Sequence, residues 1–284
     1  MVATTVQSES DFGIARLDYN DRQRIVVVED HVLEADVDDG NEERPWSFRD
    51  LADRLPFVRS DHVPTTVPNQ SLRAAKELTR EGVRILPVAR SEAAELEWSA
   101  GHPLDGLVYV GDPARPQSYY QLSDFHVRVF ENKFADALRL LGDLGARGFT
   151  VRSEEGWGRK FAGKITFPVQ AVPVTGKGGF RSRGSRKVLF SAELTPVGVE
   201  EPQDIAWLRY EPIWREIVDL RLKHGLRKFN LVVDNRSDHQ ITAEVGAKIK
   251  KASLGIGGDY EAFVETKWVI EGEFAEMPKK GLFG

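Results

Sequence analysis

Apolar and polar residues alternate in two stretches of residues 241–274, on either side of a glycine-rich segment. Successive side chains of a β-strand point to opposite faces of the sheet, so a period of two predicts a strand in each stretch. Two such strands joined by glycines predict one long antiparallel hairpin. We expect its core face to carry Val245, Ile249, Tyr260, Val264, Trp268 and Ile270.

A second pattern occurs three times: an amphipathic helix, a glycine at its C-terminal end, an arginine, and then a strand. The three instances cover residues 71–88, 134–151 and 212–233. Glycine ends a helix because it adopts the left-handed backbone conformation at low cost. The expected stop residues are Gly82, Gly145 and Gly225. These similarities are too short and irregular to predict a solenoid.

Apolar residues at three- and four-residue spacing predict which side of each helix lies on a core. In the second instance the apolar stripe consists of Val127, Phe130, Phe134, Leu138 and Leu141. In the third, Pro212 is the expected first helical residue. The same three- and four-residue spacing predicts that this helix buries Ile213, Ile217 and Leu220.

Further stretches rich in β-forming residues lie at 158–174 and 186–197. Together with the C-terminal hairpin they give at least four strands interrupted by a single helix. This order favours an α+β fold and argues against a doubly wound sheet. We therefore expect a mostly antiparallel, long-stranded sheet with about three amphipathic helices packed on it.

The first sixty or so residues differ in composition from the rest. Residues 29–43 contain eight Asp or Glu residues and no Lys or Arg, which predicts a solvated loop. A calcium loop is disfavoured, because counting back from Gly40 puts Ala35 at the first ligand position. We predict an acidic, partly ordered segment over residues 1–62, with a buried strand at Arg24–Val28. Residues 63–284 would form the α+β core domain that ends in the hairpin.

Composition narrows the function classes. With 284 residues and 41% hydrophobic content, the chain can bury a large core. A net charge of -5 argues against a surface that binds nucleic acid throughout. The sequence has no cysteine, which excludes disulfides, thiolate nucleophiles and cysteine zinc sites. No apolar run is long enough for a membrane-spanning helix, and the expected location is the cytoplasm.

A basic, glycine-rich loop over residues 175–187 is the most conspicuous chemical feature. Glycines let backbone N–H groups approach an anion, and arginine binds phosphate through two parallel hydrogen bonds. The candidate anion-binding residues are Lys177, Arg181, Arg183, Arg186 and Lys187. The loop does not match the G-x-x-x-x-G-K-[ST] pattern, and an ordinary surface loop between two strands would have the same composition.

Other catalytic patterns are missing from the sequence. The six histidines include no H-E-x-x-H and no pair four residues apart, and G-x-S-x-G does not occur. The adjacent Glu154 and Glu155 would point to opposite faces of a strand, which places them poorly for a paired acid and base. We therefore predict no metal and no cofactor.

Three functions remain open from the sequence. The first is a non-enzymatic binding or assembly protein, whose strand edges would pair with a protein partner or with further copies of the chain. The second is a membrane-active protein whose hairpins insert after oligomerisation. The third is an enzyme that acts on a phosphorylated ligand held by residues 175–187. The expected partner is a protein or a second copy, with an anionic ligand as an alternative and nucleic acid disfavoured.

Overall fold

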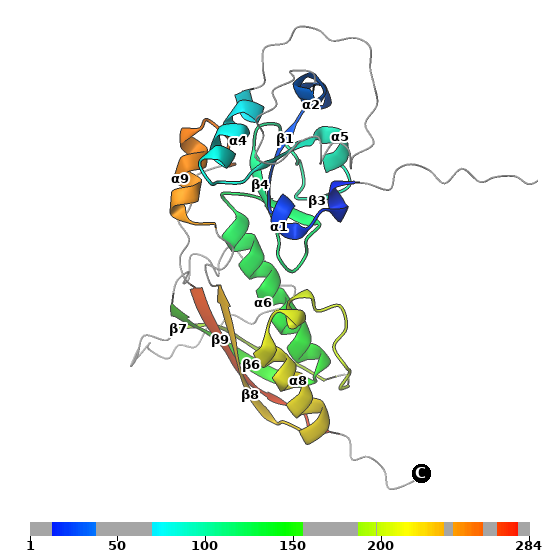
Figure 1. Cartoon of the computed structure of the whole chain (residues 1–284). Helices are drawn as coiled ribbons and strands as arrows, with labels where there is room; N and C mark the ends of the chain where they lie inside the picture. The colour runs from blue at the N-terminus through cyan, green and yellow to red at the C-terminus, as the bar shows by residue number, and fades with distance from the viewer. Residues whose placement is uncertain are drawn as a thin grey trace, which may run out of the picture. The chain divides into compact units, whose positions relative to one another are not determined.

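A computed structural model of the chain describes residues 13–37, 70–155, 187–196, 198–235, 241–257 and 266–277 (Figure 1). The chain divides into two compact units. The first combines Met1–Phe125 with Ile241–Glu261, and the second combines His126–Gln240 with Ala262–Gly284. The boundary expected between residues 62 and 63 lies outside the described residues.

The first unit contains a five-stranded mixed sheet in the order β2-β1-β4-β5-β3. Strand β1 pairs with β2 in parallel and with β4 in antiparallel orientation. Strand β5 pairs with β4 antiparallel and with β3 parallel. The strands are β1 (Arg24–Val28), β2 (Leu86–Ala89), β3 (Glu97–Trp98), β4 (Val108–Gly111) and β5 (Ser118–Gln121).

The strand predicted at Arg24–Val28 is confirmed as β1, and all five of its residues are buried. Five short helical elements of the first unit precede β4. They are η1 (Ile14–Arg16), α1 (Tyr19–Arg22), α2 (Asp30–Val37), α4 (Gln70–Arg80) and α5 (Arg90–Ala93). Helix α4 confirms the first predicted helix, and Gly82 follows it with a φ of 84°.

The strand predicted over residues 241–249 is wrong, because these residues form helix α9 (Ala243–Lys251). Ile241, Val245 and Ile249 are four residues apart, a spacing that places side chains on one face of a helix as well as of a strand. Thr242 resolves the ambiguity, because its side chain accepts a hydrogen bond from the Val245 N–H at the first turn. Lysines in the last turn complement the helix dipole.

The second unit contains a four-stranded antiparallel sheet in the order β7-β6-β9-β8. Its elements follow the order helix, strand, strand twice along the chain, with η2 (Ala206–Arg209) before the second helix. The first set is α6 (Phe125–Asp143), β6 (Ala146–Glu155) and β7 (Lys187–Glu193). The second set is α8 (Pro212–His224), β8 (Lys228–Asn235) and β9 (Thr266–Phe274).

Helices α6 and α8 confirm the second and third helix predictions. Gly145 and Gly225 follow them with φ values of 77° and 67°, the left-handed conformation that ends a helix. Strand β9 confirms the second arm of the expected hairpin, but it pairs with β6 and β8 instead of residues 241–249. The fold is therefore α+β with two sheets, and α1, α2, α5 and α9 are helices that the pattern did not predict.

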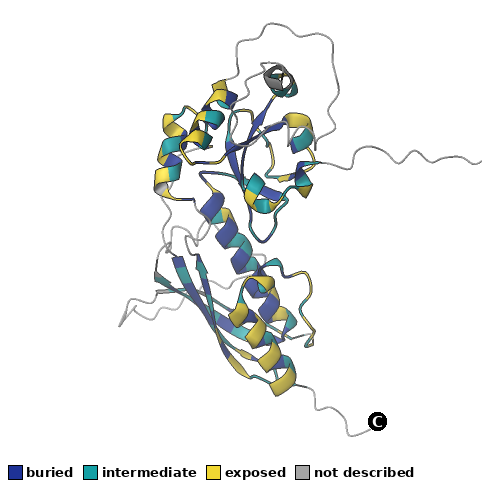
Figure 2. Ribbon diagram, in the orientation of Figure 1, coloured by how far each residue is buried: buried dark blue, intermediate teal, exposed yellow. Residues whose placement is uncertain are grey.

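The core of the second unit lies between its helices and one face of its sheet (Figure 2). Trp268 of β9 is fully buried, and its ring makes edge contacts with Phe130 and Phe134 of α6, with centroids 4.9 and 5.1 Å away. Val151, Ile270 and Leu231 form one row across β6, β9 and β8 and are all fully buried. This face is therefore the apolar one.

Helix α8 buries Trp214, Ile217 and Arg221, which lie three and four residues apart. Only Ile217 was predicted correctly: Ile213 is 64% exposed and Leu220 is 36% exposed. The Trp214 indole and the Arg221 side chain occupy the core side of α8, which turns the predicted aliphatic positions toward solvent.

Arg221 joins the ends of three elements. Its Nε donates to the Leu144 carbonyl at 2.9 Å, its Nη1 to the Leu226 carbonyl at 2.9 Å, and its Nη2 to the Ala275 carbonyl at 2.8 Å. The guanidinium also lies over the Phe274 ring, 4.8 Å from its centroid. Burial lowers the pKa of Arg221 from its ordinary value.

Candidate functional site

The four-stranded sheet of the second unit has two edge strands, β8 and β7, and their backbone groups are the candidate functional site. An edge strand presents N–H and C=O groups that can pair with another chain. An edge is open where backbone N–H and C=O groups point away from the sheet and form no hydrogen bond.

On β8 the backbone N–H and C=O groups of the even-numbered residues point away from the sheet. The Phe274 N–H donates to the Arg227 carbonyl at 2.8 Å, so Arg227 and every second residue after it face β9. The outward-pointing residues are therefore Lys228, Asn230, Val232 and Asp234.

Two side chains cap the outward carbonyls of β8. The Trp214 Nε1 donates to the Val232 carbonyl at 3.4 Å, and the Lys133 Nζ donates to the Asp234 carbonyl at 2.8 Å. Trp214 is fully buried and Lys133 is 6% exposed, so both caps belong to the folded core. Covering an edge in this way is a known protection against strand addition.

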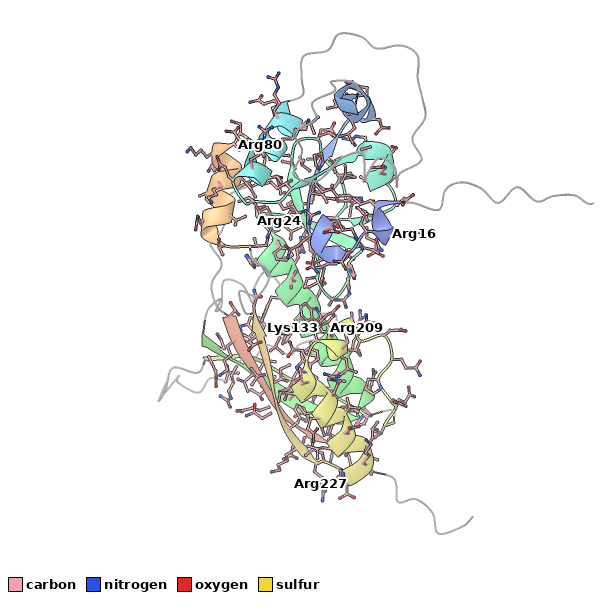
Figure 3. All side chains as sticks on the ribbon, in the orientation of Figure 1. Arg16, Arg24, Arg80, Lys133, Arg209 and Arg227 are labelled. Carbon is pink, nitrogen blue, oxygen red and sulfur yellow. The ribbon has the colours of Figure 1, made fainter. Side chains whose placement is uncertain are left out.

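Lys133 of α6 is held by charge as well as by the carbonyl (Figure 3). Its Nζ lies 2.5 Å from the Glu211 Oε1 and 3.4 Å from the Asp234 Oδ1. The same ammonium lies 5.0 Å from the centroid of the Trp207 ring, within cation–π range. These three oxygen acceptors match the three donors of an ammonium. Lys133 is therefore a structural cation, with its donors already used inside the fold.

The outer edge of β7 is different. The Leu194 N–H donates to the Arg147 carbonyl at 2.7 Å. The backbone groups of Ala192 and Phe190 therefore also face β6, while those of Ser191 and Glu193 point outward. Within the part of the chain that the structure describes, no donor or acceptor meets the outward backbone groups of Ser191 and Glu193. This edge is open among the described residues.

A β-bulge limits the open edge to a short stretch. Val151 pairs with Phe190 and Arg152 pairs with Val188, which leaves Leu189 as the extra residue. A bulge bends the strand and breaks its regular pairing. The regular part of the edge is therefore Phe190–Glu193.

The sheet face opposite the helices is polar where it borders this edge. The Thr150 and Ser191 hydroxyls lie 2.9 Å apart. On the neighbouring strands the Arg152 Nε lies 3.0 Å from the Glu271 Oε2. On the helix side the edge strand carries Ala192, which is 5% exposed. A strand added beside β7 would therefore meet polar side chains on one face and apolar ones on the other.

A polar cluster surrounds His102 in the first unit. The Nδ1 of His102 lies 2.7 Å from the Tyr109 hydroxyl and its Nε2 lies 2.6 Å from the Gln121 amide. The Leu104 N–H donates to the same hydroxyl at 2.8 Å, and burial raises the pKa of Tyr109. Both ring nitrogens of His102 have hydrogen-bond partners within the fold.

The structure separates the residues that the sequence singled out. Lys177, Arg181, Arg183 and Arg186 lie outside the described residues, and Lys187 begins β7 with only its backbone described. Of the expected hairpin core, Tyr260 and Val264 also lie outside the described residues. Val245 is half-buried and Ile249 is buried, both in α9, whereas Trp268 and Ile270 are buried in β9.

Lys133 and Trp214 were missed by the sequence analysis, although each left a signal. Lys133 directly precedes Phe134 and lies three residues after Phe130, so it falls on the apolar stripe of α6. A lysine on such a stripe indicates a buried cation that needs partners. Trp214 lies three residues before Ile217, the position that was correctly predicted to be buried.

Among the described residues, no group of three or more His, Asp or Glu side chains could hold a metal ion. None of the described helices is sufficiently long and apolar to cross a membrane. No family model matches the chain, and no curated protein or solved structure matches it.

Proposed function

We propose that the chain is a non-enzymatic binding or assembly protein, which adds an extended segment of a protein partner, or of another copy, to the outer edge of β7. The partner segment would pair with Ser191 and Glu193 through its backbone. Pairing of this kind gives affinity through main-chain hydrogen bonds and specificity through alternate side chains.

The contrast between the two edges carries this proposal. On β8, Trp214 and Lys133 donate to the carbonyls of Val232 and Asp234. On β7, the outward groups of Ser191 and Glu193 meet no other group among the described residues. Since an exposed edge invites pairing with other chains, capping two outward carbonyls of β8 while leaving those of Ser191 and Glu193 unmet favours pairing at β7.

The expected affinity follows from the number of open groups. Ser191 and Glu193 offer four backbone groups, and a hydrogen bond contributes about 1 kcal/mol net. The backbone alone would therefore contribute about 4 kcal/mol, which does no more than offset the cost of association, about 4–15 kcal/mol. Tighter binding requires side-chain contacts on the partner strand or several copies acting together.

Proline at an outward position tests the proposal without touching the internal ladder. In Ser191→Pro the lost N–H is one that β6 does not use, and proline is tolerated on the solvent side of an edge strand. Ser191→Ala controls for the lost contact between the Ser191 and Thr150 hydroxyls. Asn230→Pro is the matched control, because the Asn230 backbone also points outward, but on the strand whose Val232 and Asp234 carbonyls are capped.

The measurement uses the full chain immobilised against a displayed library of extended peptides, with sedimentation velocity across the micromolar range for self-association. We expect alternating, partly apolar peptides or a second copy to bind the parent chain, Ser191→Ala and Asn230→Pro. We expect Ser191→Pro to lose this binding while its thermal unfolding still shows a folded protein. Binding that survives Ser191→Pro, or a parent chain that binds neither peptides nor itself, would contradict the proposal.

A membrane-active protein is the second candidate, because of where the strand connections begin. Ser153 pairs with Lys187, and Asn235 pairs with Thr266. Through β6 and β9, which are antiparallel, these pairs lie at the same end of the sheet. The connections 156–186 and 236–265 therefore leave and return at one end. The second connection contains α9 of the first unit, so an insertion of both after oligomerisation would require α9 to unfold first.

Dye release from anionic and zwitterionic vesicles tests this second candidate. If oligomers of the full chain insert both connections, they should release dye as the protein concentration rises through the micromolar range. Intact vesicles under these conditions, together with a monomeric chain by light scattering, would exclude it and leave strand addition at β7.

A further inference from the structure

The second unit contains the same module twice, and equivalent residues differ by 80 in residue number. Each module is a helix followed by two strands: α6, β6 and β7 in the first, and α8, β8 and β9 in the second. Gly145 and Gly225 follow the two helices with φ values of 77° and 67°. Two residues later, the Arg147 and Arg227 carbonyls accept hydrogen bonds at 2.7 and 2.8 Å from the residue that follows the second strand or ends it.

The strand pairing and the buried helix positions repeat with the same offset. Thr150 pairs with Ser191 in the first module, and Asn230 pairs with Glu271 in the second. The buried positions shared by the two helices are Phe134 and Trp214, Ala137 and Ile217, and Leu141 and Arg221. The two modules are therefore equivalent residue by residue from the helix to the second strand.

The two modules join side by side within one sheet. The order β7-β6-β9-β8 places the second strand of each module before its first strand, so the junction lies where β6 meets β9. This junction is antiparallel, with Thr150 opposite Glu271 and Gly148 opposite Glu273. It shows how the first strand of one module pairs with the second strand of another.

Each half of this junction has an equivalent at an edge of the sheet. Strand β8 is the equivalent of β6, and β7 is the equivalent of β9. Asn230 therefore corresponds to Thr150, and Ser191 corresponds to Glu271. The backbone groups of Asn230 and Lys228 point outward, and no hydrogen bond to these groups occurs within the ranges that the structure describes. The two edges thus present the two halves of the junction that β6 and β9 form inside the chain.

The open stretches of the two edges also match in extent. On β8 the capped carbonyls belong to Val232 and Asp234, so the uncapped stretch is the one that contains Lys228 and Asn230. On β7 the bulge at Leu189 limits the regular stretch to Phe190–Glu193. In the register of the internal junction, Val232 falls opposite Leu189. The caps therefore lie where β7 is already irregular, and they do not obstruct the regular stretch.

We propose that the segment added to β7 is the β8 strand of a second copy, which runs antiparallel to it with Asn230 opposite Ser191 and Lys228 opposite Glu193. This inference rests on the strand addition proposed above and names its partner. The contact joins two different surfaces, so copies assemble head to tail, as a ring or as an open chain.

Charge at the contact is compatible with this register. Glu193 is exposed, and the Lys228 side chain is 81% exposed. The Lys228 ammonium pairs with Glu273 of its own chain at 3.2 Å. An ammonium has three donors, so Lys228 can keep this pair while it also meets Glu193 of the next copy.

Disulfide trapping tests the register, because the chain has no cysteine of its own. Four full-length variants each carry one cysteine: Ser191→Cys, Glu193→Cys, Lys228→Cys and Asn230→Cys. The mixtures 191 with 230 and 193 with 228 place the cysteines directly opposite each other. The control mixtures 191 with 228 and 193 with 230 place them two residues out of register. Every cysteine occurs once in each set, so differences in thiol reactivity cancel.

Under mild oxidation we expect the opposite mixtures to form mixed disulfide dimers about tenfold faster than the control mixtures. Opposite residues of an antiparallel pair have Cα atoms about 5.5 Å apart, whereas diagonal neighbours are about 7–8 Å apart, beyond the usual limit for a disulfide. Thermal unfolding of each variant confirms that it is folded.

Sedimentation velocity of Asn230→Pro gives a second readout. This variant keeps its β7 edge and still accepts the β8 strand of a parent copy, but its own β8 lacks the N–H that would meet Ser191. Asn230→Pro alone should therefore sediment as a monomer at concentrations where the parent chain self-associates.

Equal rates in opposite and control mixtures would overturn this inference, and so would a parent chain that stays monomeric. If such a parent chain still binds displayed peptides, strand addition at β7 stands without a second copy. If it binds no peptide either, the proposed function fails as well.

Discussion

Replacing Arg221 by methionine separates what its charge does from what its volume does. Methionine keeps most of the aliphatic stem but supplies no donor. Arg221 is fully buried and donates to three carbonyls, those of Leu144, Leu226 and Ala275. In Arg221→Met these carbonyls lose their donors together, at the point where α6, α8 and β9 end.

The magnitude follows from those three acceptors. A buried carbonyl left without a donor costs about 1–3 kcal/mol, so the upper range for three approaches 9 kcal/mol. Removing a guanidinium that is costly to bury offsets part of this, and water can reach some carbonyls at chain ends. We therefore expect Arg221→Met to lower the free energy of unfolding by about 3–5 kcal/mol, a large part of the 5–15 kcal/mol typical of a domain. Arg221→Lys should cost nearly as much, because an ammonium lacks the planar fork that reaches three acceptors.

Urea unfolding followed by tryptophan fluorescence measures the loss. Trp207, Trp214 and Trp268 all belong to the second unit, and the transition should be fitted with two steps because the chain has two units. Arg215→Met on the exposed side of α8 is the control and should change stability by less than about 0.5 kcal/mol. If Arg221→Met costs less than about 1 kcal/mol, the three carbonyls do not depend on this side chain, and the argument from burial is refuted.

Two further predictions concern the core and pH. Trp268→Ala should destabilise the second unit by about 3–5 kcal/mol because the ring is fully buried against Phe130 and Phe134; an unchanged melting temperature would count against this, with Trp268→Phe as the milder variant. Burial, reinforced by Glu95 and Asp30, raises the pKa of Glu92 above its ordinary value of 4.5, so the folded state binds this proton more tightly and the carboxylate costs stability at neutral pH. Glu92→Gln should therefore raise the melting temperature at pH 7, and the gain should disappear as the pH falls below the ordinary value; a gain that persists in acid would contradict the assignment.

Local signals in the sequence were enough to place much of the fold. The glycines at 82, 145 and 225 end α4, α6 and α8 as expected, because the left-handed conformation is a property of the residue itself. Helix α9 was missed because its large apolar residues are four apart, a spacing that fits both periods. The N-cap residue Thr242 distinguishes helix from strand here. A single capping residue carries less weight in reading a sequence than several alternating apolar residues do.

The candidate site could not be predicted in the same way, because its caps come from distant parts of the chain. Lys133 reaches a carbonyl 101 residues later in the sequence. An open edge on β7 is likewise a statement about sheet order, which periodicity does not contain. The sequence could indicate that strand edges were available, but not that Trp214 and Lys133 cap two carbonyls of one of them.

The interleaving of the two units has a consequence for synthesis on the ribosome. Strand β9 lies between β6 and β8 but is translated after both, and residues 241–257 of the first unit are translated between β8 and β9. A nascent chain that has reached Asn235 therefore carries two strands with apolar rows and no central strand to join them. Neither unit can be completed from its N-terminal part, because the first needs residues up to Glu261 and the second needs β9. Newly made chains should depend on chaperones until β9 has emerged from the exit tunnel. After a protease cut between β8 and β9, the two fragments should refold together poorly once they have separated.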